Sequence, residues 1–471
     1  EESGIIVDCI YGSGFHGELD KDSAEIIELI NKSSAWKIAC DIPSGIDSLG
    51  CIETFVKLDG ANLKSVNKKS YASPLAFRAD VTVTMGALKT ALYSDYAKEF
   101  CGKIICADLG IPRELFENSD ESVESEAVLL EETDLILPER KKQNTNKGSF
   151  GHTAIVCGEK PGAAIIAGSA AFRFGSGLVS LVLTETQKVP GNCLARNPPS
   201  SPKDGTTQAK AGVGAICTEG AFPVTCPPEL MQAFSLPANT KAIAVGMGLG
   251  VESESAGKFL SELFARQAKD SYIPMIFDAD MFSRKETVEF LEKSNADKTK
   301  LILTPHPKEF SSLLKMTGFG DFSVEEIVKN RISLCKAFVK NYPYCVILLK
   351  GANVCITRCV DFGLGGCAGS GVKAEVMPVA EDLPDAKAQP ATPETYINPF
   401  GDSCLAKGGS GDVLAGLVAA LLAQGFDFFE AAKNASLAHA LASRAQCGSY
   451  SVTPFSLIEE IGKLRENSGG F

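Results

Sequence analysis

The 471-residue sequence lacks a surplus of positive charge. It has 46 Lys and Arg against 58 Asp and Glu, a net charge of −12 at pH 7, which argues against nucleic acid or an anionic membrane as its main partner. It also lacks the ~20-residue apolar run of a membrane-spanning helix; the longest apolar run near its C-terminus is residues 413–423. Its 16 cysteines include no C-x-x-C pair, which favours a reducing cytoplasm over a secreted disulfide framework.

The start of the chain lacks two features of a secreted precursor. It begins with Glu1 rather than Met, and no cationic segment precedes its first apolar run, so no signal peptide is predicted. Such a start is typical of a fragment. The remaining composition, 45% hydrophobic and 22% charged, is that of a globular protein long enough for more than one domain.

Short β-branched runs alternate with helical stretches, which predicts α/β domains with parallel sheets. We expect a first domain over residues 1–116, an acidic linker over 117–128 and a second domain over 129–471. Stretches near 187–226 and 361–396 are expected to be long loops or insertions. The expected strands are 5–11, 38–42, 81–84 and 104–107 in the first domain, and 153–157, 178–183, 242–245, 275–277, 301–303 and 346–349 in the second.

A glycine-rich turn at residues 408–411 runs directly into an apolar helix expected over 412–424. Glycines let backbone N–H groups approach an anion, and a helix N-terminus adds roughly half a positive charge, so the turn is suited to holding phosphate. Asp412 has two interpretations. It is either an N-cap that accepts backbone N–H bonds, or a general base that takes the proton of a hydroxyl attacking a phosphoryl group.

Polar clusters follow four further strands of the second domain. They begin at Gly246, Asp278, Thr304 and Lys350, and each alone is a weak signal. Because the carboxyl ends of parallel strands share one edge of a sheet, we expect these clusters and Asp412 to form one active site.

Small residues dominate the segment 161–171. They predict a helix that either admits a flat ligand or packs tightly against another helix. Both interpretations stay open at this point.

In the first domain, Asp8 lies within a strand that leads into a glycine-rich turn at residues 12–17, and a second strand ends at Asp41 and Ser44. Buried carboxylates are costly unless a cation or several donors compensate them. Asp8, Asp41 and Ser44 can therefore form an oxygen site for a hard cation beside a phosphate or hydroxyl pocket. Ordinary capping and turn residues would give the same pattern.

Taken together, these motifs resemble the bifunctional NAD(P)H-hydrate repair enzymes, in which an epimerase domain is fused to an ADP/ATP-dependent NAD(P)H-hydrate dehydratase. The matching segments are residues 7–17, 41–45, 79–84 and 108–112 in the first domain, and 147–151, 161–164, 246–250, 278–280, 304–309, 350–352 and 405–416 in the second. The resemblance implies an α/β protein with an N-terminal Rossmann-like parallel-sheet epimerase domain and a C-terminal ribokinase-like α/β dehydratase domain.

For the second domain, the resemblance implies that a nucleotide phosphorylates the ring hydroxyl of (6S)-NAD(P)H hydrate and that loss of phosphate restores NAD(P)H. Phosphorylation turns hydroxide, a poor leaving group, into a good one. The implied catalytic base is Asp412. The implied contacts to ADP or ATP, which acts with Mg²⁺, are Gly409, Ser410, Gly411, Lys350, Gly351, Ala352, Asn353 and Val354, and those to the hydrate are Ala163, Gly248, His306 and Asp412.

For the first domain, the resemblance implies a K⁺ site at Asp8 and Ser44 and a catalytic role for Asp41. The implied substrate contacts are Gly12, Ser13, Gly14, Phe15, His16, Gly17, Glu18 and Asp41. In the family, an Asn-Asn-Gly-Gly-Asp-Gly segment supplies a further K⁺ ligand and part of the substrate site. Its position would be upstream of Glu1, and the sequence does not contain it. We therefore expect a truncated first domain without epimerase activity.

The nearest alternative is a ribokinase-like kinase of a vitamin precursor, such as a hydroxymethylpyrimidine or hydroxyethylthiazole, with the same Asp412 and glycine turn. The fused first domain argues against it, because such kinases lack that domain. A third hypothesis makes the first domain a structural or oligomerisation module without chemistry. Since members of the family assemble, we also expect a homo-oligomer.

Overall fold

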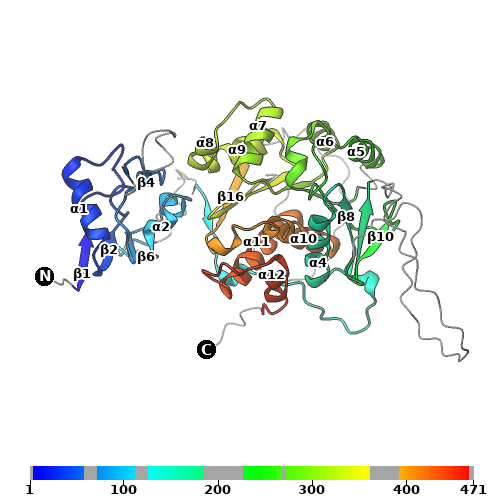
Figure 1. Cartoon of the computed structure of the whole chain (residues 1–471), viewed down its shortest axis with the longest axis horizontal. Coiled ribbons are helices and arrows are strands. Elements are labelled where there is room, and N and C mark those ends of the chain that lie inside the picture. The colour runs from blue at the N-terminus through cyan, green and yellow to red at the C-terminus, as the bar shows by residue number, and fades with distance from the viewer. Residues whose placement is uncertain are drawn as a thin grey trace, which may run out of the picture.

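The computed structural model describes residues 4–57, 72–112, 126–184, 226–267, 272–360 and 392–465, which form two α/β domains (Figure 1). The larger domain begins with strand β7 (Val128–Leu129), which spans the expected boundary between linker and second domain. Both domains are built on parallel or mainly parallel sheets. The expected fold class is therefore confirmed.

The smaller domain has a four-stranded parallel sheet in the order β1-β2-β5-β6. The elements of the smaller domain are β1 (Ile5–Asp8), α1 (Lys21–Asn31), β2 (Trp36–Cys40), β3 (Phe55–Lys57), β4 (Ala72–Pro74), β5 (Val81–Met85), η2 (Thr90–Tyr93), α2 (Lys98–Cys101) and β6 (Lys103–Ala107). Strands β3 and β4 form a separate two-stranded sheet. Asp20 caps α1 by accepting the Ser23 N–H. The helix then buries Ile27 against Ala39 of β2, so it covers one face of the sheet.

The opposite face of this small sheet is open within the described part of the chain. Alternate residues along the strands point to the same side, and five large apolar side chains on that side are exposed: Ile5, Val7, Trp36, Met85 and Ile105. Parallel sheets are usually covered on both faces, so this apolar face is unusual for such a sheet.

The larger domain has a ten-stranded sheet in the order β10-β9-β8-β11-β12-β13-β14-β15-β16-β7. The strands from β10 to β14 are parallel. They are β8 (His152–Cys157), β9 (Leu178–Leu183), β10 (Met231–Ala233), β11 (Ala242–Val245), β12 (Met275–Phe277), β13 (Leu301–Leu303) and β14 (Cys345–Leu349). The antiparallel partners β15 (Val354–Val360) and β16 (Thr392–Asn398) complete the sheet with β7.

Two layers of helices cover this sheet, one on each face (Figure 1). One layer contains α4 (Pro161–Arg173), α10 (Ser410–Ala423), α11 (Phe428–Arg444) and α12 (Pro454–Ile461). The other contains α5 (Glu254–Arg266), α6 (Lys285–Asp297), α7 (Pro307–Met316), α8 (Val324–Lys329) and α9 (Arg331–Asn341). Each face of the sheet therefore has its own apolar core.

Helices α4 and α10 are in close contact, as the packing interpretation of residues 161–171 predicts. A Cβ on Gly416 of α10 would lie 2.1 Å from the Ala167 carbonyl oxygen of α4. Such a distance is possible only because both helices carry small residues where they cross. Tight packing therefore accounts for the small residues of α4 that face α10, whereas a ligand contact at Ala163, at the start of the helix, stays a prediction.

All ten strands expected from the sequence are present; four have the expected ends, and the ends of the others shift by one to three residues. Four strands of the larger sheet, β7, β10, β15 and β16, were not expected. Residues 392–396 belong to β16 rather than to a loop, because β16 pairs with β15 over all of its seven residues. The remainder of the expected insertion at 361–396, and residues 187–225, lie outside the described residues. Where the chain is described, no helix combines the length and apolarity needed to cross a bilayer.

Candidate active site

The carboxyl ends of β11, β12, β13 and β14 lie side by side, because these strands are neighbours in the parallel part of the larger sheet. The polar clusters that begin at Gly246, Asp278, Thr304 and Lys350 directly follow these strands. The fold thus brings all four clusters to one sheet edge, where open α/β sheets bind ligands.

The Lys350 ammonium, which follows β14, contacts carboxylates that follow the neighbouring strands β12 and β13. Its Nζ lies 2.7 Å from Asp278 Oδ1 and 3.8 Å from Glu309 Oε2. The Thr304 hydroxyl donates to the same Asp278 oxygen at 2.8 Å. Burial lowers the pKa of Lys350, but the carboxylates of Asp278 and Glu309 outweigh burial and raise it above its usual value. The ammonium is therefore charged at neutral pH.

Asp412 is the third residue of α10 and not its N-cap. The helix begins at Ser410, its N-cap is Gly409, and no side chain caps this end of the helix. The capping interpretation of Asp412 is therefore wrong. Burial raises the pKa of Asp412 to about 6; the charge of Asp278 adds to this effect and that of Lys350 opposes it. A carboxylate with a pKa close to the working pH suits a general base.

The glycine turn before α10 lies against the charged cluster. A Cβ on Gly411 would lie 3.5 Å from Lys350 Nζ and 4.0 Å from Asp278 Oδ2. Gly409 has a φ of +93°, a left-handed conformation that favours glycine. The turn, Lys350 and Asp412 therefore surround one small region.

His439 of α11 supports this turn, although the sequence analysis did not single it out. Its Nε2 lies 3.1 Å from Ser410 Oγ and 3.0 Å from the Ser410 carbonyl oxygen. Burial lowers the pKa of His439 to about 4, so the ring is neutral at pH 7. Nothing in the local sequence marks this histidine, because its partner lies 29 residues away in the chain.

Two expected hydrate contacts, Ala163 and Gly248, lie next to each other. A Cβ on Gly248, whose φ is +62°, would lie 3.2 Å from Ala163 Cβ. The Lys160 N–H donates to the Gly248 carbonyl oxygen at 2.9 Å, which ties the start of α4 to the loop after β11. Asp280 fixes the end of the same loop by accepting the Gly250 N–H at 2.8 Å.

His306 is the N-cap of α7 and joins the cluster through Glu309. Its Nδ1 accepts the Glu309 N–H at 3.1 Å, and Glu309 Oε2 accepts the His306 N–H at 2.8 Å. Glu309 in turn lies within 4 Å of Lys350. The contacts of the described residues do not bring His306 against Ala163 or Gly248.

The turn between β14 and β15 contains the expected nucleotide contacts Lys350, Gly351, Ala352 and Asn353, and Val354 begins β15. Asn353 is 2% exposed. Its side-chain amide donates to the carbonyl oxygens of Tyr93 and Ser94 in the smaller domain, at 2.8 and 3.2 Å. The Asn353 side chain is therefore directed to the smaller domain.

Asp8 and Ser44 meet at the ends of β1 and β2 in the smaller domain. Asp8 Oδ1 accepts the Ser44 hydroxyl at 2.7 Å, and Oδ2 accepts the Ser44 N–H at 2.8 Å. Asp8 is 3% exposed and makes no ion pair with the residues that the structure describes. A buried carboxylate that only hydrogen bonds compensate, beside a hydroxyl oxygen, fits a monovalent cation.

Asp41 is held by Lys89 rather than by the Asp8–Ser44 pair. Lys89 Nζ lies 2.6 Å from Asp41 Oδ1, which also accepts the Met85 N–H at 3.1 Å. Burial raises the pKa of Asp41, but Lys89 and the Met85 N–H together lower it below its usual value. Asp41 is therefore ionised at neutral pH. The sequence analysis missed Lys89, whose partner lies 48 residues away in sequence.

The expected substrate-binding turn of the smaller domain lies against Asp41. A Cβ on Gly12 would lie 3.8 Å from Asp41 Oδ2. The Phe15 N–H donates to the Gly12 carbonyl oxygen at 3.0 Å, and His16 Nδ1 lies 3.0 Å from the Gly14 carbonyl oxygen. The turn that includes Ser13, Gly17 and Glu18 thus follows β1 and reaches the end of β2.

Among the described residues, no group of three or more His, Cys, Asp or Glu side chains is arranged to hold a metal ion. The carboxylates of Asp278, Asp280 and Glu309 act electrostatically on Asp412, and Lys350 is the cation between them. A divalent ion at this edge would therefore need most of its ligands from a bound phosphate chain.

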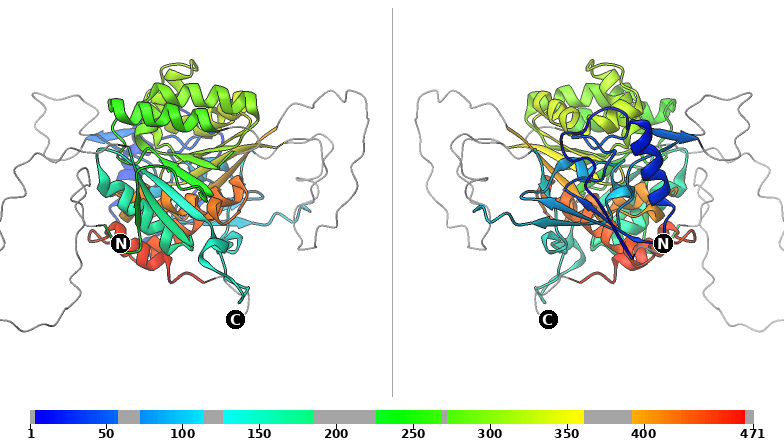
Figure 2. Two further views of the ribbon diagram at one scale, coloured as in Figure 1. Left: turned by 90° about the vertical axis from the view of Figure 1, so that its right-hand side faces the viewer. Right: turned by 90° about the vertical axis from the view of Figure 1, so that its left-hand side faces the viewer.

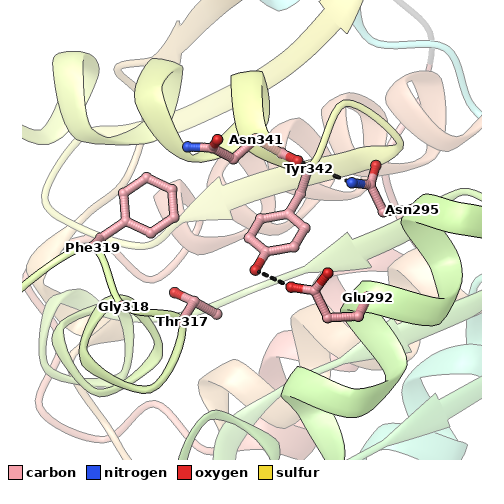
Figure 3. Close-up of a pocket in the computed structure, with 7 residues that line it drawn as sticks. All are labelled: Glu292, Asn295, Thr317, Gly318, Phe319, Asn341 and Tyr342. Atoms are coloured by element: carbon pink, nitrogen blue, oxygen red, sulfur yellow. Dashed lines mark hydrogen bonds between the residues drawn. The ribbon is translucent and has the colours of Figure 1, made fainter.

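A separate surface pocket lies at the opposite edge of the sheet (Figure 3). It has a volume of about 360 Å³ and is formed at the C-terminal ends of α6, α7 and α9. Its lining residues are Glu292, Asn295, Thr317, Gly318, Phe319, Asn341 and Tyr342. None of the expected site residues belongs to it, and the Tyr342 hydroxyl donates to Glu292 across it.

Comparison with known proteins identifies similar chains over both domains. A sequence profile described as NAD(P)H-hydrate dehydratase matches residues 153–362 and 386–463, and one described as YjeF-related protein N-terminus matches residues 1–91. The bifunctional NAD(P)H-hydrate repair enzyme Nnr of Helicobacter pylori is 33% identical over 463 residues, 98% of this chain and 76% of that protein. The corresponding enzyme of Coxiella burnetii is 27% identical over 93% of this chain and 70% of its own length.

Among solved structures, the ADP/ATP-dependent NAD(P)H-hydrate dehydratase of Bacillus subtilis, co-crystallised with ATP and Mg²⁺, is similar to this chain. It is 22% identical, covers 73% of this chain and 98% of its own, and has a TM-score of 0.45. The two profiles lie one after the other along the chain, in the fused arrangement that separates the repair enzymes from the alternative vitamin-precursor kinases.

Proposed function

This chain belongs to the family of bifunctional NAD(P)H-hydrate repair enzymes, and from that premise we propose that its larger domain dehydrates (6S)-NAD(P)H hydrate to NAD(P)H with ADP or ATP as phosphoryl donor. The observation that carries this proposal is the position of Asp412. Its carboxylate has a pKa raised to about 6, a rise that the charge of Lys350 opposes, and it directly follows Gly411, the glycine that lies next to the Lys350 ammonium.

In the proposed reaction, Asp412 accepts the proton of the ring hydroxyl as the hydroxyl oxygen attacks the terminal phosphorus of the nucleotide. The bond from that phosphorus to the bridging oxygen breaks, and the shortened nucleotide leaves. The carbon–oxygen bond of the new phosphate ester then breaks, the ring loses a proton, and inorganic phosphate and NAD(P)H are released. The positive charge of Lys350 would stabilise the charge that develops on the phosphoryl oxygens.

The nucleotide would lie between the turn of residues 350–354 and the glycine turn at 408–411. Two observations support this location: Lys350 Nζ and Gly411 are neighbours, and the N-cap of α10 is Gly409, which offers no side-chain acceptor to this end of the helix, an end suited to an anion. Mg²⁺ would enter with the nucleotide and take most of its ligands from the phosphates. Ala163 at the start of α4 and Gly248 in the loop after β11, which lie close together, would hold the hydrate, with a further contact from His306, the N-cap of α7.

The direct test mixes the purified chain with (6S)-NADH hydrate, Mg²⁺ and ADP or ATP and follows the return of reduced-nicotinamide absorbance. We expect recovery that requires nucleotide and is lost in Asp412→Asn. A stable phosphate ester in place of inorganic phosphate and NADH would favour the kinase alternative. Absence of recovery with folded protein that binds nucleotide would contradict the dehydratase proposal.

The sequence alone leads us to expect no epimerase activity, but residues 1–91 match the YjeF-related N-terminal profile; for the smaller domain we therefore propose the interconversion of the R and S epimers of the same hydrate. The supporting observation is the ionised Asp41 carboxylate beside the glycine-rich turn that starts at Gly12. Asp8 and Ser44 would hold K⁺, which would compensate the buried Asp8 charge. The substrate would contact the turn and Asp41.

This second proposal is tested with the R epimer alone, under conditions in which spontaneous epimerisation is slow. We expect the wild-type chain to recover NADH from the R epimer, and Asp41→Asn to lose this recovery while it still converts the S epimer. If the wild type converts only the S epimer, the smaller domain is a structural module and the epimerase proposal is wrong.

A cytoplasmic location and a homo-oligomeric state stay predictions. Free thiols at all described cysteines support a reducing compartment. The open apolar face of the smaller sheet, which includes Ile5, Val7 and Ile105, is a surface that a second copy would cover. Light scattering of the purified chain measures the oligomeric state directly.

A further inference from the structure

The turn between β14 and β15 is held by the smaller domain as well as by its own sheet. Figure 1 shows the smaller domain beside β16, and the right-hand view of Figure 2 shows it in front of the larger domain. Hydrogen bonds join the two domains. The contacts come from the segment of residues 93–98, which includes the end of η2 and the start of α2. They reach Gly351, Ala352 and Asn353.

Asp95 lies at the centre of this contact. Its Oδ1 accepts Arg331 Nη1 at 2.6 Å and the Asn353 N–H at 2.9 Å. Arg331 Nη1 also donates to the Asn353 carbonyl oxygen at 2.7 Å. The side chains of Arg331 and Asp95 are 7% and 16% exposed. Removing one partner of a buried ion pair leaves an uncompensated charge, so this network strongly favours one conformation of the turn.

Lys98 makes the second set of contacts across the same boundary. Its Nζ donates to the carbonyl oxygens of Ala352, Pro399 and Gly401, the last two at 3.0 and 2.7 Å. These are backbone groups, so the contacts fix the path of the chain rather than that of a side chain. Asp95 also lies so close to the turn that residue 351 has no room for a side chain, because a Cβ there would lie 2.5 Å from Asp95 Oδ2.

We propose that Asp95 and Lys98 of the smaller domain are positioning residues for nucleotide binding in the larger domain. This inference rests on the proposed function, in which the turn of residues 350–354 contacts the nucleotide. Neither side chain touches the reacting atoms. Both side chains contact the turn from the side of the smaller domain. Lys350, the first residue of the turn, places its ammonium against Asp278 and the glycine turn.

A positional error of about 1 Å in a binding group weakens binding beyond the energy of the lost contact. The smaller domain would therefore support the nucleotide site whether or not it has chemistry of its own. The effect expected from losing either residue is weaker nucleotide binding with little change in the chemical step.

The test measures the Kd of ADP and of ATP by equilibrium titration with Mg²⁺ and without hydrate, so that turnover is not required. We expect Asp95→Ala and Lys98→Met each to raise Kd about tenfold, and Asp95→Asn, which keeps an acceptor oxygen, to recover part of the loss. In turnover assays, KM for nucleotide should rise while kcat stays within about twofold of the wild type.

Glu53→Gln is the matched control. Glu53 pairs with Lys329 across the same domain boundary at 3.7 Å but does not contact the turn. The Kd of Glu53→Gln for ADP and for ATP should therefore equal that of the wild type. A general loss of domain contact would affect all the variants alike.

Three outcomes separate the proposals. Unchanged Kd in both Asp95→Ala and Lys98→Met, with native circular dichroism, overturns this inference. If Asp95→Ala fails to fold because Arg331 is left unpaired, Lys98→Met decides alone. A wild-type chain that binds nucleotide but restores no NADH overturns the proposed dehydratase, whereas one that binds no nucleotide overturns both.

Discussion

Lys350 Nζ lies 2.7 Å from Asp278 Oδ1, although 72 residues separate them in the chain. This ion pair links the ends of β12 and β14, which flank β13 in the sheet. It places a fixed positive charge at an edge that otherwise gathers the carboxylates of Asp278, Asp280, Glu309 and Asp412. Without Lys350 these acids would repel both each other and a bound phosphate chain.

The raised pKa of Asp412 predicts an acidic limb in the rate profile. A general base must be deprotonated, so kcat/KM should fall about tenfold per pH unit below pH 6 and level off above it. The measurement is the rate of NADH recovery between pH 4.5 and 8.

The control for this profile is the stability of the protein over the same range, followed by circular dichroism. A rate that stays constant down to pH 5 in folded enzyme would show that Asp412 is not the group that titrates.

Replacing Asp278 by Asn should shift the acidic limb of the kcat/KM profile to lower pH. The negative charge of Asp278 raises the pKa of Asp412 and Lys350 lowers it; in Asp278→Asn the first effect is lost and the second stays. The rate at pH 5, relative to the maximum of the same variant, should therefore increase. Thr304→Val, which removes a donor to Asp278 without a change in charge, is the comparison, and its limb should move little. If the acidic limb of Asp278→Asn moves to higher pH, the assignment of that limb to Asp412 is wrong.

His439 predicts a pH-dependent part of the folding stability. Its pKa is about 4 when folded and 6.5 when exposed, so between these values the unfolded chain binds more protons and stability falls as the pH falls. The full difference is on the order of 3 kcal/mol. Urea unfolding of the wild type and of His439→Asn at pH 7 and pH 5 measures the part of this difference that develops above pH 5.

Asp412 acts in the opposite direction in the same pH window, because its folded pKa is raised. The difference between wild type and His439→Asn isolates the histidine. If both chains lose the same stability from pH 7 to pH 5, His439 is not buried as a neutral ring.

Gly416→Ala should destabilise the larger domain. Alanine has a helix propensity about 1 kcal/mol better than glycine, but its Cβ would lie 2.1 Å from the Ala167 carbonyl oxygen, and overpacking of this kind costs about 1–3 kcal/mol or more. The clash outweighs the propensity because backbone, not a flexible side chain, must move. The measurement is the free energy of unfolding in denaturant.

Gly162→Ala is the matched control on the partner helix α4. A Cβ at Gly162 would have no heavy atom within 4 Å, so propensity alone acts and stability should be unchanged or higher. Equal effects of the two substitutions would contradict the close α4–α10 packing.

The sequence by itself determined the class of the fold and the location of most site residues. The expected strands are short apolar runs whose composition leaves little alternative, and polar residues directly after them fall on one edge because parallel strands end together. The glycine turn before α10 and Asp412 could be found in the same way, since local composition marks both.

Only the tertiary structure decided which distant groups meet. The pairs Lys89–Asp41, His439–Ser410 and Arg331–Asp95 join segments that no periodicity relates, so nothing in the local sequence identifies the partners. Strand β16 was missed for the same reason, because its pairing with β15 is a long-range contact. The position of Asp412 within α10, which excludes the N-cap interpretation and leaves the interpretation as a general base, depended on where the helix begins, at Ser410 after the left-handed Gly409.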